Sequence, residues 1–122
     1  GNAVILSATF KLERSTCEAV QAKVDAVNEK RRCAQPAGAS FGSTFKNPAG
    51  AHAARLIEAA GLKGTRIGGV EVSPVHANFM VNDGTGCAED YRKLIELVRK
   101  AVLDKFAVVL ELEIELFGDW KN

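Results

Sequence analysis

The stretch Gly42-Ser43-Thr44-Phe45-Lys46-Asn47-Pro48 places a glycine, a hydroxyl, a cation and a side-chain amide close together. Glycine frees the backbone beside Ser43, and Asn-Pro is typical of the start of a turn. Because a helical pattern begins just after Gly50, we expect Ser43 to lie on a loop held by packed elements, where functional groups concentrate. Ordinary turn chemistry explains the same residues, so a functional loop and a plain turn both remain open at this point.

The composition describes a chain the size of one globular domain. It has 122 residues, of which 47% are hydrophobic and 25% charged, enough apolar material for a core. The 16 basic and 15 acidic side chains are mixed along the sequence and give a net charge of +1, so nothing favours nucleic acid or an anionic membrane as a partner. The apolar runs are too short to cross a bilayer, and no signal-peptide pattern is present. We therefore expect a cytoplasmic location.

The cysteines and histidines do not indicate a metal site. Cys17, Cys33 and Cys87 cannot all pair within the chain, and their spacings match neither a zinc site nor a redox Cys-x-x-Cys motif. We expect them to be reduced. A metal site that uses His52 and His76 is the weaker alternative, because no two candidate ligands are close in sequence.

The first part of the chain predicts one strand and one helix. Residues 3–12 alternate apolar with mixed side chains, which is typical of a strand. Ser15 or Thr16 can then cap a helix that extends to about Arg32 and carries an apolar stripe (Val20, Val24 and Val27). The basic cluster at residues 30–32 fits either compensation of the helix dipole or an anion-binding site, and both interpretations stay open.

The second part predicts a mixture of helices and strands. A short helix is expected over residues 51–60 and a long one from about 88 to 105, with strands over 70–73 and 78–82 that form an irregular hairpin. Over residues 110–116, Leu and Ile alternate with Glu, which predicts a strand with one buried and one acidic face. Since regular βαβ units are missing, we expect an α+β fold with a small antiparallel or mixed sheet and helices packed on one face.

Five segments taken together carry a family resemblance. They are residues 42–48, Leu56-Ile57-Glu58 with Gly61-Leu62-Lys63-Gly64, Ile67-Gly68-Gly69, Ser73 with residues 76–82, and Leu110-Glu111-Leu112-Glu113-Ile114. In this order they resemble the C-terminal domain of UDP-N-acetylenolpyruvoylglucosamine reductase, also called UDP-N-acetylmuramate dehydrogenase, from about Val4 to Gly118. The run His76-Ala77-Asn78-Phe79 is similar to the form of the family that lacks an extra substrate-covering insertion.

The resemblance implies a flavoenzyme of peptidoglycan precursor synthesis, and hence of cell-wall biogenesis. In such an enzyme NADPH and FAD reduce UDP-N-acetylglucosamine enolpyruvate to UDP-N-acetylmuramate. The proton-donating serine of the family corresponds to Ser43, and the glutamate that stabilises the intermediate corresponds to Glu113. Arg32 (or Arg31), Asn47 and His76 stand where the family has substrate-binding residues.

The resemblance also implies that a large part of the enzyme lies outside this chain. The family's FAD-binding domains and a catalytic arginine precede the matched region. We therefore expect residues 1–13 to be the strand that ends the FAD-binding portion, and residues 14–122 to be the C-terminal substrate-binding domain. Alone, this piece is expected to be inactive and not to retain FAD. The alternative function is a non-catalytic binding or interaction module that keeps the fold without the chemistry.

Overall fold

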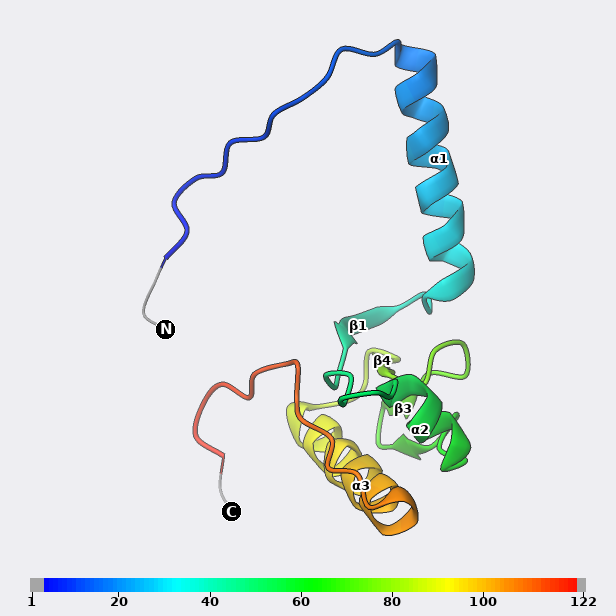
Figure 1. Cartoon of the computed structure of the whole chain (residues 1–122). Helices are drawn as coiled ribbons and strands as arrows, with labels where there is room; N and C mark the ends of the chain where they lie inside the picture. Colours follow the sequence, from blue (N-terminus) through cyan, green and yellow to red (C-terminus); the bar gives the residue numbers. More distant parts are fainter. Residues whose placement is uncertain (1–3, 121–122) are drawn as a thin grey trace. The chain divides into compact units, whose positions relative to one another are not determined.

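The computed structural model describes residues 4–120, and the chain divides into two units, residues 1–31 and 32–122 (Figure 1). In chain order the elements are α1 (Cys17–Ala34), β1 (Ala39–Ser43), α2 (Ala53–Ala59), β2 (Arg66–Ile67), β3 (Val70–Val72), β4 (Phe79–Asn82) and α3 (Ala88–Phe106). Across residues 4–120, no helix combines the length and the apolar character that crossing a membrane requires.

The first unit buries none of its described residues. Residues 4–16 have neither helix nor strand, and α1 begins after Thr16, whose Oγ1 accepts a hydrogen bond from the backbone N of Ala19 at 3.2 Å. The cap expected at Ser15 or Thr16 is thus confirmed at Thr16. The strand predicted over residues 3–12 is wrong for residues 4–12, because a strand needs hydrogen bonds to a neighbour and none of the described strands pairs with this segment. Residue 3 lies outside the described part of the chain.

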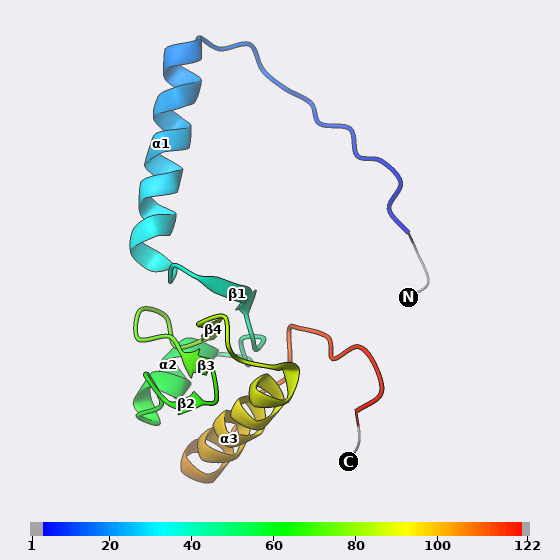
Figure 2. The ribbon, with the colours of Figure 1, turned by 180° about the vertical axis from the view of Figure 1, so that it is seen from behind.

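The second unit is built on a four-stranded sheet in the order β1-β4-β3-β2, and every pairing is antiparallel. Helix α3 packs against β2 and β3, and α2 packs against α3, as the two opposite views show (Figures 1 and 2). The buried core side chains come from α2, β3, β4 and α3 and from the segments around Phe45 and Leu110. Those of Ile57, Val70, Val72, Leu94, Val98, Val102 and Leu110 are 0% exposed. The α+β class and the antiparallel form of the sheet are therefore confirmed.

The sequence analysis missed the two edge strands. In β1 the sequence offers only a short alternation interrupted by Gly42, whose φ of +82° accompanies a register shift between Ser40 and Ser43 in the pairing with β4. Strand β2 is two residues long and turns into β3 through Gly68-Gly69. A Cβ atom at Gly69 would lie 2.2 Å from the backbone N of Gly86, so only glycine allows this close approach.

The strand predicted over residues 110–116 is also wrong, since only one bridge forms there, between Phe45 and Leu112. The partner segment turns away at Asn47-Pro48, where proline has no N–H to continue a ladder. The predicted alternation of burial is nevertheless present at the start of the segment, where Leu110 is fully buried and its neighbours are exposed. The apolar pattern sets the inward face even where strand pairing is minimal.

An ion-pair cluster joins β2, β3 and the loop after β4. The Arg66 guanidinium contacts the carboxylates of Glu71, at 2.8 Å, and Asp83. Thr85 donates to Asp83 Oδ1 from its hydroxyl at 2.7 Å and from its backbone N at 3.0 Å. These hydrogen bonds from Thr85, followed by the one from Arg66, lower the pKa of Asp83 from 3.8 to about 2. The charged carboxylate therefore stabilises the folded state.

This lowered pKa predicts an acid-dependent loss of stability. The contribution of Asp83 is fully present above its ordinary pKa of 3.8 and is lost as the pH falls toward 2. Asp83→Asn should lower the melting temperature at pH 7. The difference in melting temperature between the variant and the wild type should become smaller as the pH falls from about 4 to 2. Thermal unfolding followed by circular dichroism between pH 7 and 2 measures this. Asp104→Asn, in the exposed pair with Lys100, is the control and should change little at any pH. A gap that stays constant from pH 7 to 2 contradicts the assignment.

Candidate active site

The loop that follows Ser43 is held by one buried amide side chain, that of Asn78. Its Oδ1 accepts from the Phe45 backbone N at 3.0 Å, and its Nδ2 donates to the Phe45 carbonyl at 2.8 Å. The Asn78 carbonyl also accepts from the Thr44 backbone N at 2.8 Å. Asn78 is 4% and Phe45 2% exposed, whereas Ser43, at the end of β1, is exposed. The hydroxyl of Ser43 is therefore presented to solvent from a backbone that is fixed immediately after it.

Two backbone hydrogen bonds bring Glu113 to the same loop. Glu113 N donates to the Thr44 carbonyl and Lys46 N donates to the Glu111 carbonyl, each at 2.9 Å. Alternate residues of this extended segment point to opposite faces, so Leu112 and Ile114 are partly buried whereas Glu113 between them is exposed. Residues far apart in the chain thus place a carboxylate near the serine.

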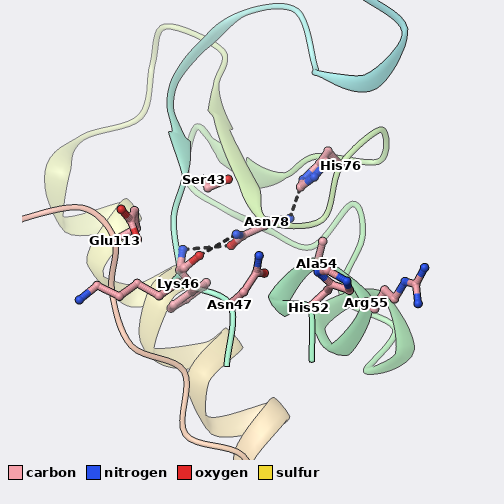
Figure 3. A pocket seen from close by; sticks show the side chains of 10 residues that line it. Ser43, Lys46, Asn47, His52, Ala54, Arg55, His76, Asn78 and Glu113 are labelled. Carbon is pink, nitrogen blue, oxygen red and sulfur yellow. Dashed lines mark hydrogen bonds between the residues drawn. The ribbon is translucent and has the colours of Figure 1, made fainter. Parts of the chain in front are cut away.

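A cavity of about 610 Å³ lies at this loop (Figure 3). Four of the five site residues predicted from the sequence line it, namely Ser43, Asn47, His76 and Glu113, together with Phe45, Lys46, His52, Ala54, Arg55 and Asn78. In Figure 3, Lys46 and Glu113 lie on one side and the α2 residues on the other, with Ser43, Asn47 and Asn78 between them. Arg32, in the last turn of α1, is not among the described residues that line this cavity.

The His76 ring is held in a defined orientation. Its Nδ1 accepts from the Asn78 backbone N at 3.3 Å, and its ring meets Phe79 edge-on at 4.8 Å between centroids. The hydroxyl of buried Ser73 accepts from the backbone N atoms of Val75, at 3.1 Å, and His76, at 3.2 Å, which fixes the connecting turn. Since Nδ1 is an acceptor, the neutral ring carries its proton on Nε2, and His76 offers the cavity wall a donor there.

Asn47 has a structural role that the sequence analysis did not anticipate. Its Oδ1 accepts from the backbone N of Ala53, the first residue of α2, at 3.0 Å. The first backbone N–H groups of a helix have no partner within the helix, so this bond stabilises the start of α2. The Asn47 Nδ2 donor has no partner among the described residues and is available to a ligand.

Sequence reasoning missed four polar residues of the cavity. None of the four was named as a substrate-binding or catalytic residue: Lys46 was noted only as the cation of the opening stretch, and His52 only as a metal ligand in the weaker alternative. Asn78 was noted only as part of a strand and of the run that resembles the family. Lys46, His52 and Arg55 follow Ser43 closely in sequence, which is the signal that could have found them. Two cations, two histidines and one carboxylate give the cavity an excess of hydrogen-bond donors and positive charge. Such a lining suits a ligand with several anionic groups.

Ser43 and Glu113 line a second cavity as well. It measures about 760 Å³, and we call it the aromatic cavity because its lining includes the rings of Phe41, Tyr91, Phe117 and Trp120. The rings of Phe41 and Tyr91 lie 5.1 Å apart. The Trp120 indole N–H is buried and has no acceptor among the described residues. One hydroxyl and one carboxylate thus stand between a polar cavity and an aromatic one.

The possible metal ligands of the described chain are its His, Cys, Asp and Glu side chains, which include the three cysteines. Within residues 4–120, no three His, Cys, Asp or Glu side chains are grouped closely enough to hold a metal ion. Cys17, Cys33 and Cys87 are all exposed. Their reduced state stays a prediction.

The glycine-containing loop from β4 to α3 does not fit a dinucleotide phosphate. The backbone N atoms of Gly84 and Gly86 donate to Asn82 Oδ1 at 2.8 and 3.0 Å, and that of Thr85 donates to Asp83. The N of Cys87, just before α3, donates to Asp90 at 3.0 Å. A phosphate-binding loop needs free N–H groups, whereas here side-chain oxygens already occupy them and the carboxylates would repel a phosphate. In this arrangement the backbone N–H groups of residues 84–87 all have side-chain acceptors within the domain.

The fold and its surface define an α+β domain with two neighbouring cavities that share Ser43 and Glu113. Residues 35–117 match the family described as the C-terminal domain of UDP-N-acetylenolpyruvoylglucosamine reductase. The chain belongs to this family.

Three relatives illustrate how much of the full enzyme the chain spans. The chain is 48% identical to UDP-N-acetylenolpyruvoylglucosamine reductase of Chloroflexus aggregans, over 93% of the chain and 38% of that protein. It is 48% identical to UDP-N-acetylenolpyruvoylglucosamine reductase 2 of Bacillus cereus, over 98% of the chain and 39% of the relative. The crystal structure of the reductase from Thermus caldophilus superposes with a TM-score of 0.73 and 37% identity, over 88% of the chain and 38% of that structure. The chain thus spans well under half the length of these relatives.

Proposed function

We propose that this chain is the substrate-binding and catalytic C-terminal part of a reductase of peptidoglycan precursor synthesis. The reductase uses NADPH and FAD to convert UDP-N-acetylglucosamine enolpyruvate to UDP-N-acetylmuramate in the cytoplasm. The observation that carries the proposal is that Ser43 and Glu113 line both the polar and the aromatic cavity. Two side chains shared by two ligand-sized spaces suit a reaction in which two molecules meet.

The roles of the two residues follow from the chemistry of the double bond. The flavin, when bound, supplies a hydride to one alkene carbon, and the alkene electron pair moves to the carbon beside the carboxylate. That carbon is then basic enough to take the proton of the Ser43 hydroxyl, which is regained from solvent. The cations of the cavity stabilise the negative charge that develops on the substrate carboxylate. Glu113 contributes when its carboxyl group carries a proton, because the acid can then donate a hydrogen bond to that charge. The sum is one hydride and one proton added across the double bond.

The polar cavity suits the anionic UDP-sugar. Asn47 Nδ2 and the His76 ring supply donors, and the exposed cations Lys46 and Arg55 complement the diphosphate. We also assign a substrate contact to Arg32, because the resemblance places it there. That contact would have to form outside the described cavity lining.

The remaining chain of the full-length reductase supplies the FAD-binding site. The occupied N–H groups of the loop between β4 and α3 support this assignment. We assign residues 1–13 to the end of that FAD-binding portion and residues 14–122 to the substrate-binding domain. Residues 4–31 are exposed throughout, as expected of a segment that packs against protein outside this chain.

An assay of the full-length protein tests the proposal. NADPH oxidation should depend on UDP-N-acetylglucosamine enolpyruvate, whereas this chain purified alone should be colourless and inactive. Flavin absorbance that persists in the purified chain contradicts the assignment of FAD to the remainder of the enzyme. A full-length protein that oxidises no NADPH with this substrate supports the alternative, a non-catalytic binding module.

A further inference from the structure

We propose that Asn78 is a positioning residue of this reaction, which aligns the Ser43 hydroxyl through the backbone of the loop. This role rests on the proposed function. Asn78 touches neither the proton nor the electrons that move in the reaction, and it acts by fixing the residues that do.

The side chain of Asn78 replaces a missing strand neighbour. Beyond Ser43 the strand pairing of β1 with β4 ends, and the Thr44 N–H makes a last backbone bond to the Asn78 carbonyl. Without the Asn78 side chain, the backbone groups of Phe45 would have no partner on that side. The Asn78 amide takes up the N–H and the C=O of Phe45 together, at 3.0 and 2.8 Å, as a peptide group does in a sheet. The chain that follows Ser43 is therefore as firmly held as a paired strand.

Asn78 also connects the other proposed site residues. Its carbonyl accepts from Thr44 N, and the Thr44 carbonyl in turn accepts from Glu113 N. Its own backbone N donates to Nδ1 of His76. Ser43, Glu113 and His76 are thus all within one or two hydrogen bonds of a single buried residue. A shift of Asn78 would displace all three relative to each other.

The chemistry of the contact selects asparagine. A primary amide offers one donor and one acceptor at this reach, and both are used. A carboxylate of the same shape keeps the acceptor for the Phe45 N–H but places an oxygen against the Phe45 carbonyl. A neutral carboxylic acid, in contrast, has an O–H that can donate to that carbonyl. Because Asn78 is 4% exposed, water cannot readily substitute for the lost donor.

Asn78→Asp in the full-length enzyme therefore has a signature in pH. Burial and the facing carbonyl should raise the pKa of the introduced carboxyl group above its ordinary value. At pH 8 the group is ionised, the loop shifts, and kcat should fall by about 10²-fold, since small misplacements of reacting groups have effects of this size. At pH 5.5 the protonated group restores the contact and most of the loss should disappear, with KM little changed at either pH.

The ratio of variant to wild-type kcat is the quantity to follow. His52, His76, Glu113, Lys46 and Arg55 line the same cavity in both proteins, so their own effects largely cancel in the ratio. Val98→Ala is the control for instability, because Val98 lies in the α3 core with 0% exposure and does not line the cavity. Val98→Ala should lower the melting temperature, and the ratio of its kcat to the wild-type kcat should be the same at pH 8 and pH 5.5.

Hydrogen exchange of the Phe45 amide gives a readout that does not depend on turnover. It should be slow in the wild type, and in the variant its protection relative to the wild type should increase as the pH falls. The positioning role alone is overturned if the wild-type enzyme turns over but the ratio of variant to wild-type kcat is close to one, or is the same at pH 8 and pH 5.5. A wild-type enzyme without turnover would overturn the proposed function and this role with it. The inference is supported if the ratio of variant to wild-type kcat and the relative protection of the Phe45 amide both increase as the pH falls.

Discussion

Replacing Ser43 by alanine in the full-length reductase is expected to reduce kcat by about 10²- to 10⁴-fold, which is the usual effect of losing a positioned general acid. The substitution removes the only atom of Ser43 that can donate a proton, the side-chain hydroxyl. It should not disturb the loop, because Thr44 and Phe45 are held through their backbones by Asn78. Steady-state oxidation of NADPH in the presence of the enolpyruvyl substrate measures the effect.

Two further serine variants sharpen this prediction. Ser43→Cys keeps a donor of similar reach and should retain more activity than the alanine variant. Ser40→Ala makes the same chemical change three positions earlier in β1, where Ser40 pairs with Val81 and does not line the cavity. It should keep nearly wild-type turnover. Equal losses at Ser40 and Ser43 would indicate a general weakening of the strand instead of the loss of a proton donor.

Glu113→Gln is expected to lower kcat on the order of 10²-fold, comparable to the loss of one group that stabilises a developing charge. Glutamine has the same shape, but it cannot lose or share a carboxyl proton. The backbone N–H of Glu113 keeps its bond to the Thr44 carbonyl, so the segment should remain in place. The kcat of the full-length enzyme, together with its melting temperature, separates chemistry from stability.

The neighbouring carboxylate provides the control. Glu111 lies two residues earlier, does not line either of the two cavities and faces the Lys46 ammonium at 3.9 Å with 75% of its side chain exposed. Exposed pairs of this kind contribute little, so Glu111→Gln should be mild. If both variants lose activity equally, the acidic face acts as a whole and Glu113 has no special role.

Local periodicity was sufficient to predict the helices and the central hairpin. The apolar spacing that places Leu94, Val98 and Val102 on one face of α3 is a property of a single segment, and the same holds for β3 and β4. Strand formation is different, because it depends on a neighbour. The alternation over residues 110–116 predicted the inward face correctly, but it could not show that the partner backbone ends at Asn47-Pro48.

The site shows the same limit. Ser43, Asn47, His76 and Glu113 were found through their types and their resemblance to a family, and the fold places them around one cavity. Their catalytic and binding roles stay predictions. Asn78 was quoted as part of a family motif but given no role of its own, because its contact with the Phe45 backbone is not recorded by any pattern in the sequence. Arg32 was chosen from the resemblance alone, and the described cavity lining does not include it.

Rapid mixing of full-length Ser43→Ala tests the central claim most directly, because flavin absorbance separates the two half-reactions. Reduction of the flavin by NADPH needs no proton donor at the substrate carbon, whereas reoxidation by the enolpyruvyl substrate does. The proposed role of Ser43 predicts a nearly unchanged rate of reduction and a rate of reoxidation lowered by about 10²- to 10⁴-fold. Slow reduction with normal reoxidation would contradict it and would leave Ser43 as a structural residue of the loop.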